Sequence, residues 1–181
     1  QITDGTLSES VLVEVVAGGE VQDSIMSDEG GQFGGPTISD EKLEVQPDYD
    51  EVTFRVGGVD LKTIPFESET QEVTLNATQE ELAPFFTTSE VESNSPVEGG
   101  EEVTVTATIE NEGALSDTQN ISLVNASGDT VDSTAVSLSY NESTTASLSF
   151  ETDGDTSIDE TYTVESADSE ASVAIEVERV T

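Results

Sequence analysis

Carboxylates are the only side chains in this sequence that could do acid–base or metal chemistry. The 181 residues include 40 Asp and Glu, four Lys and Arg, no His and no Cys. Without imidazole or thiol groups, neither a Ser-His-Asp nor a Cys-His nucleophile can be built, and zinc loses its preferred ligands. Two acids in one cleft could still hydrolyse a glycosidic bond. With so many acids a chance pair carries no weight, so we predict that the protein is not an enzyme.

The best candidate for a cation site is the acidic segment 153–160. Asp153, Asp155 and Asp159 bring three carboxylates close together in sequence, and carboxylate oxygens are the ligands that Ca²⁺ takes. The segment departs from an EF-hand loop, because it lacks Gly at the sixth position and Glu at the twelfth. The alternative is an acidic hairpin loop between two strands, which we favour. No other cofactor is expected.

Four Asn-x-Ser/Thr sequons indicate an exported protein, because these motifs accept glycans only after export. The chain begins with Gln1, which is typical of a chain whose signal peptide has been removed. We therefore predict an extracellular, cell-surface protein. The expected glycosylation sites are Asn76, Asn120, Asn125 and Asn141.

The formal net charge of −36 indicates that the chain folds in a solvent of high salt concentration. At molar salt the screening length falls to about 3 Å, so that repulsion between the acids largely vanishes. Intrinsic disorder is the competing interpretation, but the aliphatic residues recur in strict alternation. The charge excludes binding to nucleic acid, whose phosphates carry the same sign. No apolar run reaches the roughly 18 residues that span a bilayer, so direct membrane insertion is not expected.

Alternating apolar and polar residues in the C-terminal half predict about seven short strands, as in an immunoglobulin-like sandwich. The clearest run is Val103–Ile109, and a first strand is expected near Phe86–Glu92. The other runs include Ile121 and Leu123, Val136 and Leu138, Ala146 to Phe150, Tyr162 and Val164, and Val173 to Val177.

The N-terminal half is also β-rich but less regular. Residues 50–64 contain two alternating runs joined by Gly57-Gly58, which predicts a hairpin in which Phe54 faces Leu61 and Arg55 faces Asp60. Residues 73–77 predict a further strand. Thr78 to Glu81 then has the pattern of a capping box that opens one helical turn.

The chain is predicted to form two tandem β-sandwich domains, residues 1–86 and 87–181, with the boundary between residues 83 and 92. The Gly-rich segment 24–36 is expected to be a long flexible loop. Before it, residues 10–17 predict a strand that is apolar on both faces. It either belongs to its own domain or is donated to a neighbouring subunit. The assembly residues would be Val11, Leu12, Val13, Val15 and Val16.

A family resemblance covers about residues 87–180. The run from Val103 to Gly113, with its Ile109-Glu110-Asn111-Glu112-Gly113 corner, is followed by Ile121-x-Leu123 and by the segment 143–150. These motifs resemble the CARDB family of cell-adhesion-related, immunoglobulin-like domains found in archaeal and bacterial surface proteins. The resemblance implies an extracellular module used in adhesion or as a spacer, without shared catalytic residues. The composition is similar to that of proteins secreted by haloarchaea.

The sequence leaves three functions open. The leading hypothesis is a repeating subunit of a pilus-like surface filament or array, whose partner is another copy of itself or another surface protein. The second is a monomeric adhesion or glycan-binding module, although three Tyr, six Phe and no Trp provide few aromatics for a binding platform. The third is a spike or decoration protein of a halophilic archaeal virus.

Overall fold

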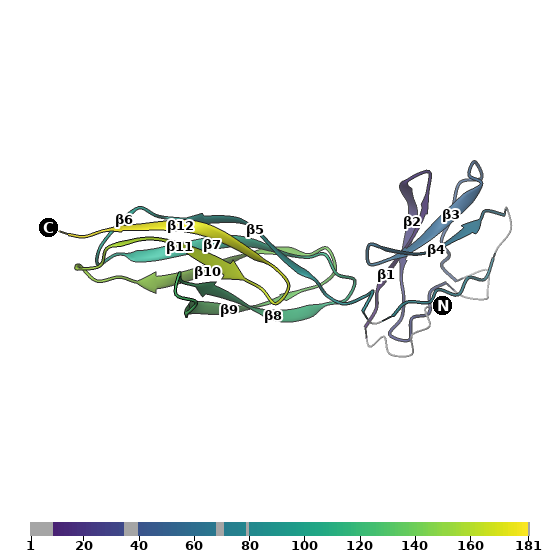
Figure 1. Ribbon diagram of the computed structural model, residues 1–181. Helices are drawn as coiled ribbons and strands as arrows, with labels where there is room; N and C mark the ends of the chain where they lie inside the picture. The colour runs from purple at the N-terminus through teal and green to yellow at the C-terminus, as the bar shows by residue number, and fades with distance from the viewer. Residues whose placement is uncertain (1–8, 35–39, 68–70, 79, 181) are drawn as a thin grey trace. The chain divides into compact units, whose positions relative to one another are not determined.

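The chain divides into two compact units (Figure 1). The computed structural model describes residues 9–34, 40–67, 71–78 and 80–180. Unit 1 comprises residues 1–84 and 113–115, and unit 2 comprises residues 85–112 and 116–181. The described residues contain strands and turns and no helix, which confirms the prediction of an all-β protein.

Unit 1 contains one antiparallel sheet of four strands in the order β2-β1-β3-β4. Among the described residues no second sheet covers it, so it differs from the two-layer sandwich predicted for residues 1–86. Its core is completed instead by buried side chains from loops, including Leu75, Leu82 and Ala114. The strands are β1 (Leu12–Ala17), β2 (Glu20–Met26), β3 (Glu51–Val56) and β4 (Val59–Pro65).

Strand β1, which was considered as a donated strand, is an inner strand of its own sheet. It pairs with β2 along one edge and with β3 along the other. A register shift between Val15 and Val16 lets both residues and Ala17 be buried, and this explains the apolar run on both faces. With both edges occupied inside one chain, β1 has no free edge to offer a neighbour. The structure therefore corrects the strand-donation hypothesis for residues 10–17.

The β3–β4 hairpin has the predicted Gly-Gly turn but not all of the predicted register. Gly57 and Gly58 have φ values of 50° and 81°, which a two-residue hairpin turn requires. Arg55 and Asp60 face each other and form an ion pair of 2.8 Å, as predicted. A register shift between Phe54 and Arg55 then places Phe54 opposite Lys62 instead of Leu61. The bulge was not visible in the alternating pattern.

Among the described glycines of unit 1, Gly57 tolerates a side chain least. A Cβ atom there would overlap with the Cα and Cβ atoms of Ala114, and the positive φ is itself unfavourable for an L-residue. We predict that Gly57→Ala lowers the free energy of unfolding by about 2–4 kcal/mol. Gly19→Ala is the control: Gly19 has a φ of 84° but nothing within 4 Å of its Cβ position, so about 1 kcal/mol is expected. Equal losses in chemical denaturation would contradict the packing argument.

The described residues 71–78 after β4 form an irregular segment with one isolated bridge, at Leu75, and not the predicted strand. Leu75 and Ala77 are nevertheless buried. The predicted capping box is present: Thr78 N–H donates to Glu81 Oε2 at 2.7 Å, and Glu81 N–H donates to Thr78 Oγ1 at 3.2 Å. The bonds from the Thr78 backbone and hydroxyl hold the pKa of Glu81 below its usual range.

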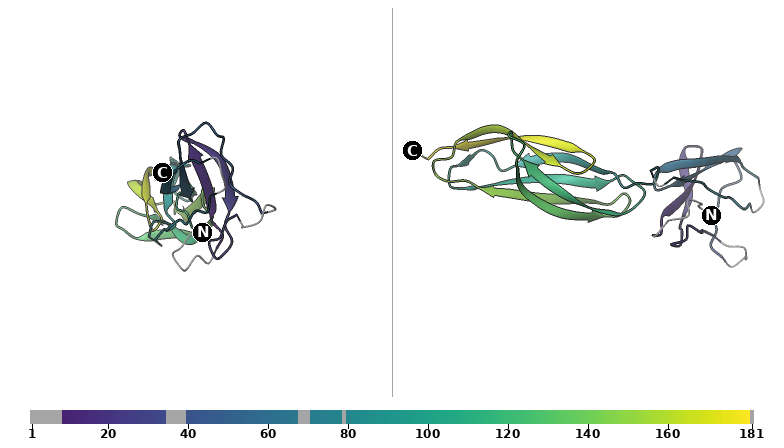
Figure 2. Two further views of the ribbon diagram at one scale, coloured as in Figure 1. Left: turned by 90° about the vertical axis from the view of Figure 1, so that its right-hand side faces the viewer. Right: turned by 60° about the horizontal axis from the view of Figure 1, so that its bottom comes forward.

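Unit 2 is a sandwich of a three-stranded sheet, β10-β7-β5, and a five-stranded sheet, β6-β12-β11-β8-β9 (Figures 1 and 2). Six of its strands follow the predicted alternation and β5 lies where a first strand was expected, while β6 was not predicted. The strands are β5 (Phe86–Ser93), β6 (Val97–Glu98), β7 (Glu102–Asn111), β8 (Asp117–Val124), β9 (Thr130–Leu138), β10 (Ser143–Glu151), β11 (Ile158–Glu165) and β12 (Glu170–Glu178).

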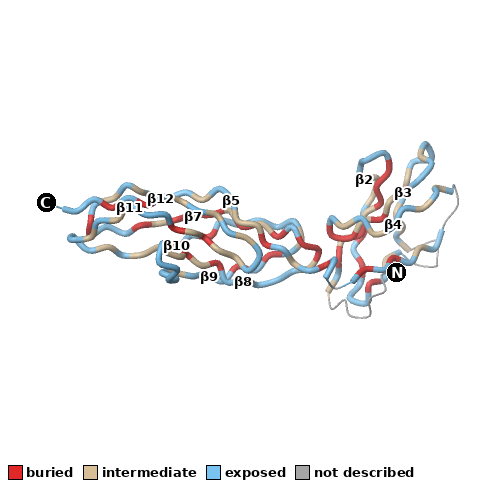
Figure 3. The backbone as a smooth tube through the Cα atoms, viewed as in Figure 1, coloured by how far each residue is buried: buried red, intermediate tan, exposed pale blue. Residues whose placement is uncertain are grey.

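The core of unit 2 lies between its two sheets and follows the period of two. Buried positions alternate with exposed or half-buried ones along β7, as the tube in Figure 3 shows. Phe150 and Tyr162 stack across the layers with ring centroids 5.0 Å apart. The immunoglobulin-like sandwich predicted for the C-terminal half is therefore confirmed.

Side chains join the two sheets of unit 2 at the corner between β5 and β12. Phe86 N–H donates to Asp168 Oδ2 at 2.9 Å, and Thr88 N–H donates to Ser169 Oγ at 2.7 Å. Farther along, Ser95 Oγ accepts from Glu176 N–H at 2.6 Å and donates to the Glu176 carbonyl at 3.1 Å. Hydrogen bonds of side chains from both sides thus join β5 and the residues after it to the neighbouring sheet.

Candidate functional site

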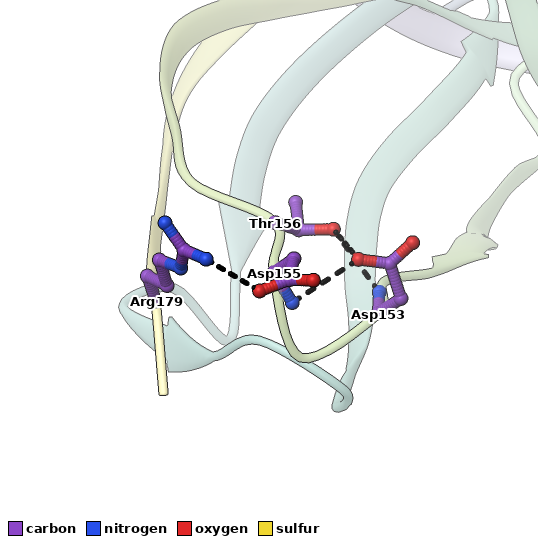
Figure 4. A network of polar contacts seen from close by, with 4 residues as sticks. All are labelled: Asp153, Asp155, Thr156 and Arg179. Atoms are coloured by element: carbon purple, nitrogen blue, oxygen red, sulfur yellow. Dashed lines mark hydrogen bonds and ion pairs between the residues drawn. The ribbon is translucent and has the colours of Figure 1, made fainter. Parts of the chain in front are cut away.

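The acidic loop between β10 and β11 is held by bonds among its own residues (Figure 4). Asp153 Oδ1 accepts hydrogen bonds from Thr156 Oγ1 at 2.9 Å and from Asp155 N–H at 3.2 Å. Thr156 Oγ1 in turn accepts from Asp153 N–H at 3.1 Å. Such side chain-to-backbone bonds are how Asp and Thr stabilise turns. One oxygen of Asp153 is therefore already engaged in shaping the loop.

The other two predicted ligands point to different partners. Asp155 Oδ1 forms an ion pair of 2.6 Å with Arg179, which follows the end of β12 (Figure 4). Asp159 lies within β11, opposite Glu176 of β12. Among the described residues no three acids are grouped so that they could hold a metal ion. The predicted site at Asp153, Asp155 and Asp159 is not assembled, and the segment is an acidic loop between strands, the alternative that was favoured.

The asparagines of the four sequons differ in exposure and in the type of element on which they lie. Asn141 lies in the turn between β9 and β10, with an exposed side chain and a φ of 56°. Asn125 lies in the β8–β9 turn and is half-buried; its Oδ1 accepts from the N–H groups of Ser127 and Asp129. Asn120 is exposed on the outer face of β8, and Asn76 is exposed in a loop of unit 1.

A buried polar residue, Asn111, determines how three strands of unit 2 meet. Its Oδ1 accepts from Phe85 N–H at 3.1 Å, and its Nδ2 donates to the Leu138 carbonyl at 3.2 Å. Its main chain bonds to Asn141 and Glu142 at the turn before β10. Asn111 is fully buried. The sequence motif marked this corner, but its contacts lie 26 and 27 residues away and could not be assigned from the sequence.

A second buried polar group, Gln119, closes the same end of unit 2. Its Nε2 donates to Asp168 Oδ2 at 2.7 Å, and its Oε1 accepts from Ala167 N–H at 3.0 Å. Asp168 also caps β5 at Phe86, so one carboxylate joins three strands. Nothing in the alternating pattern distinguished Gln119, because a buried Gln occupies an ordinary inward position of β8. Both buried groups serve the fold and present no reactive atom to solvent.

The surface of unit 2 offers shallow hollows and no deep pocket among the most pronounced ones. The larger has a volume of 370 Å³ and lies between residues 134–138 of β9 and 142–147 at and before β10. The other, of 360 Å³, is lined by Ser116–Thr118 and Ser137–Ser139. Small-molecule sites are usually concave and largely apolar, which neither hollow is. No helix among the described residues is long and apolar enough to cross a membrane.

Comparison with known proteins identifies the sandwich. The family model of the CARDB domain matches residues 83–179. The comparison with curated proteins finds no match. One similar solved structure is the CARDB domain of a Pyrococcus furiosus protein in complex with di-metal ions, with 12% identity and a TM-score of 0.42; the match covers 54% of this chain and 96% of that one.

Two further structures are similar over most of this chain. Domains 4 and 5 of the S-layer protein SbsC show 15% identity and a TM-score of 0.34, with 91% of this chain and 99% of that one covered. The alpha-2-macroglobulin of E. coli shows 13% identity and a TM-score of 0.34, with 94% of this chain and 10% of that one covered.

Proposed function

The chain belongs to the CARDB family through residues 83–179, and on this premise we propose that it is a non-enzymatic extracellular module of a cell-surface protein. Its role is that of a spacer or adhesion module. The family match carries this proposal, because CARDB domains are non-catalytic immunoglobulin-like modules. The surface of unit 2 agrees with it: its acids are spread over both sheets, and its most pronounced hollows are shallow.

We also propose that the protein works in an environment of high salt concentration. In unit 2 several acids lie directly opposite one another on paired strands, for example Glu102 opposite Glu151 and Asp159 opposite Glu176. Like charges in this position destabilise a sheet unless ions screen them. A chain with a charge of −36 that also places acids opposite acids is suited to a solvent in which screening is strong.

Glycan binding through aromatic side chains is less well supported than a spacer or adhesion role. Among the described residues, Phe85 is the one aromatic that is prominently exposed, at 46%. Phe150 and Tyr162 stack at the core of unit 2. A flat aromatic platform for sugar rings is therefore not present on the described surface.

Mass spectrometry of peptides from native material tests export. We expect a glycan on Asn125 or Asn141 first, since both lie in turns where a sugar meets no core. Attachment at Nδ2 of Asn125 leaves Oδ1 available for its two turn bonds. Asn120 and Asn76 are expected to be occupied when the surfaces around them are free. Four unmodified sequons would contradict export through a glycosylating pathway and would favour the viral hypothesis.

A further inference from the structure

Unit 1 is built from two separate pieces of the chain. Residues 1–84 supply its sheet, and residues 113–115 return to it from the loop between β7 and β8. We call residues 113–115 the return segment. Between the two pieces the chain forms β5, β6 and β7 of unit 2. Unit 1 is therefore not completed by residues that are neighbours in the sequence.

The return segment is part of the core of unit 1. Ala114 is 4% exposed and belongs to the hydrophobic cluster that lines the sheet, and Leu115 packs against that cluster. The N–H of Leu115 donates to the carbonyl of Leu82 at 3.1 Å. Ala114 lies so close to Gly57 that a Cβ atom at Gly57 would overlap with it. Since no second sheet covers the sheet of unit 1 among the described residues, losing the return segment would open this core to water.

The two ends of the intervening chain are bonded to each other inside unit 2. Phe86 of β5 pairs with Asn111 of β7. Next to this pair, Glu112 N–H donates to the carbonyl of Phe85 at 2.9 Å, and Phe85 N–H donates to Asn111 Oδ1 at 3.1 Å. The chain enters unit 2 at Phe85 and turns back towards unit 1 after Glu112. Folding of unit 2 therefore brings the ends of the two pieces of unit 1 together.

The entropy of loop closure gives the size of this effect. Without unit 2, the contact between Leu82 and Leu115 closes a flexible loop of about 30 residues, which lowers the equilibrium constant about 100-fold. Once β5 and β7 are paired, this entropy has already been lost. Folded unit 2 therefore favours the folding of unit 1 by about 100-fold. Because coupling between two equilibria is reciprocal, folded unit 1 stabilises unit 2 by the same factor.

We propose that unit 2 is the template on which unit 1 folds, so that unit 1 is folded only while unit 2 is folded. The coupling is symmetrical, and the dependence is one-sided because the cores differ. Unit 2 encloses its core between two sheets, and a domain of ordinary stability tolerates a 100-fold loss. Unit 1 has one described sheet, whose core is closed by loops that include the return segment. This inference does not depend on the proposed location at the cell surface.

Hydrogen exchange of the full chain in increasing denaturant, at about 3 M salt, tests the order of unfolding. The amides of β1 and β3 report on unit 1, and those of β7 and β11 report on unit 2. We expect β1 and β3 to lose protection at a denaturant concentration no higher than β7 and β11 do. Protection of unit 1 under conditions in which unit 2 exchanges freely would overturn the proposal.

Two buried substitutions test the one-sided dependence. Ala114→Asp places a charge in the core of unit 1 and is expected to lower the protection of β1 and β3 at least about 100-fold. Unit 2 is expected to stay folded, with protection lowered about 100-fold by the lost coupling. Leu123→Asp places a charge at a fully buried position of unit 2, and is expected to abolish protection in both units.

Ala126→Asp is the matched control. It makes the same substitution at an exposed alanine in the turn between β8 and β9, and is expected to change protection in either unit less than about twofold. Persistent protection of β1 and β3 in Leu123→Asp would show that unit 1 folds without its template. Loss of both units in Ala114→Asp would reject the one-sided dependence. Equal effects of Ala114→Asp and Ala126→Asp would assign the loss to charge and reject the role of the return segment.

Discussion

Lowering the salt from about 3 M to about 0.1 M is expected to unfold the protein. At the lower concentration the screening length increases from about 3 Å to about 10 Å, which exceeds the spacing between paired strands. The charge of −36 then repels across the whole surface, while small domains have only a few kcal/mol of reserve. Four pairs of acids lie directly opposite each other on paired strands: Glu98–Glu178, Glu102–Glu151, Asp159–Glu176 and Glu165–Glu170.

Circular dichroism and melting temperature, measured at a series of salt concentrations, provide the test. Glu151→Gln removes one acid from a facing pair, and should make the melting temperature of unit 2 less dependent on salt. Glu92→Gln is its control, because it removes the same charge from an exposed position opposite Thr106. A β spectrum and a melting temperature that do not change across the salt series would refute the adaptation to high salt. Equal slopes for the two variants would refute the role of facing pairs.

Asn111→Ala is expected to destabilise unit 2 by about 2–4 kcal/mol, because one buried and one partly buried backbone group lose their partners. The buried group is the carbonyl of Leu138, and the partly buried group is the N–H of Phe85. Water does not replace the bond to the Leu138 carbonyl, since the side chain of Asn111 that makes it is fully buried. In a domain of ordinary stability such a loss leaves little folded protein.

Asn94→Ala is the control, because the side chain of Asn94 makes the same two kinds of hydrogen bond as that of Asn111. Asn94 also donates once to a backbone carbonyl, that of Glu102, and accepts once from a backbone N–H, that of Thr104. Its side chain is exposed, so water replaces both bonds, and the expected loss is about 1 kcal/mol or less. Denaturant unfolding at high salt compares the two variants. A loss at Asn111 no larger than the loss at Asn94 would contradict the account of this corner.

The sequence predicted the strands of unit 2 well because each one has a buried face and a solvated face. Alternation is a local property, and the runs around Val105, Ile121 and Leu148 read directly as strands. The pairing of β6 was not predictable, since its two residues are ordered by Val177 and Glu178, far away in the sequence. In unit 1 bulges near Val15 and Phe54 broke the period of two, and the register was accordingly wrong there.

The candidate sites were less predictable than the fold, because the sequence contains so many acidic residues. Where acids are abundant, a short spacing such as Asp153 to Asp159 carries no information about which carboxylates meet. The partner of Asp155 is Arg179, a residue that no local pattern connects with the loop. Buried polar residues such as Asn111 were likewise hidden, because their partners are defined only when the strands assemble.

The side-chain bonds at the corner between β5 and β12 determine how unit 2 responds to tension. The chain enters the sandwich at Phe86, beside Asp168, and leaves it after Glu178, beyond the Ser95–Glu176 contact at the other end. A pull on both ends therefore acts along the strands and loads many bonds in shear at the same time, instead of opening them one by one like a zipper. The bonds of Asp168, Ser169 and Ser95 add to this resistance because they bridge the first and the last long strand. Under tension, a module built in this way is expected to resist extension better than one whose terminal strands peel apart.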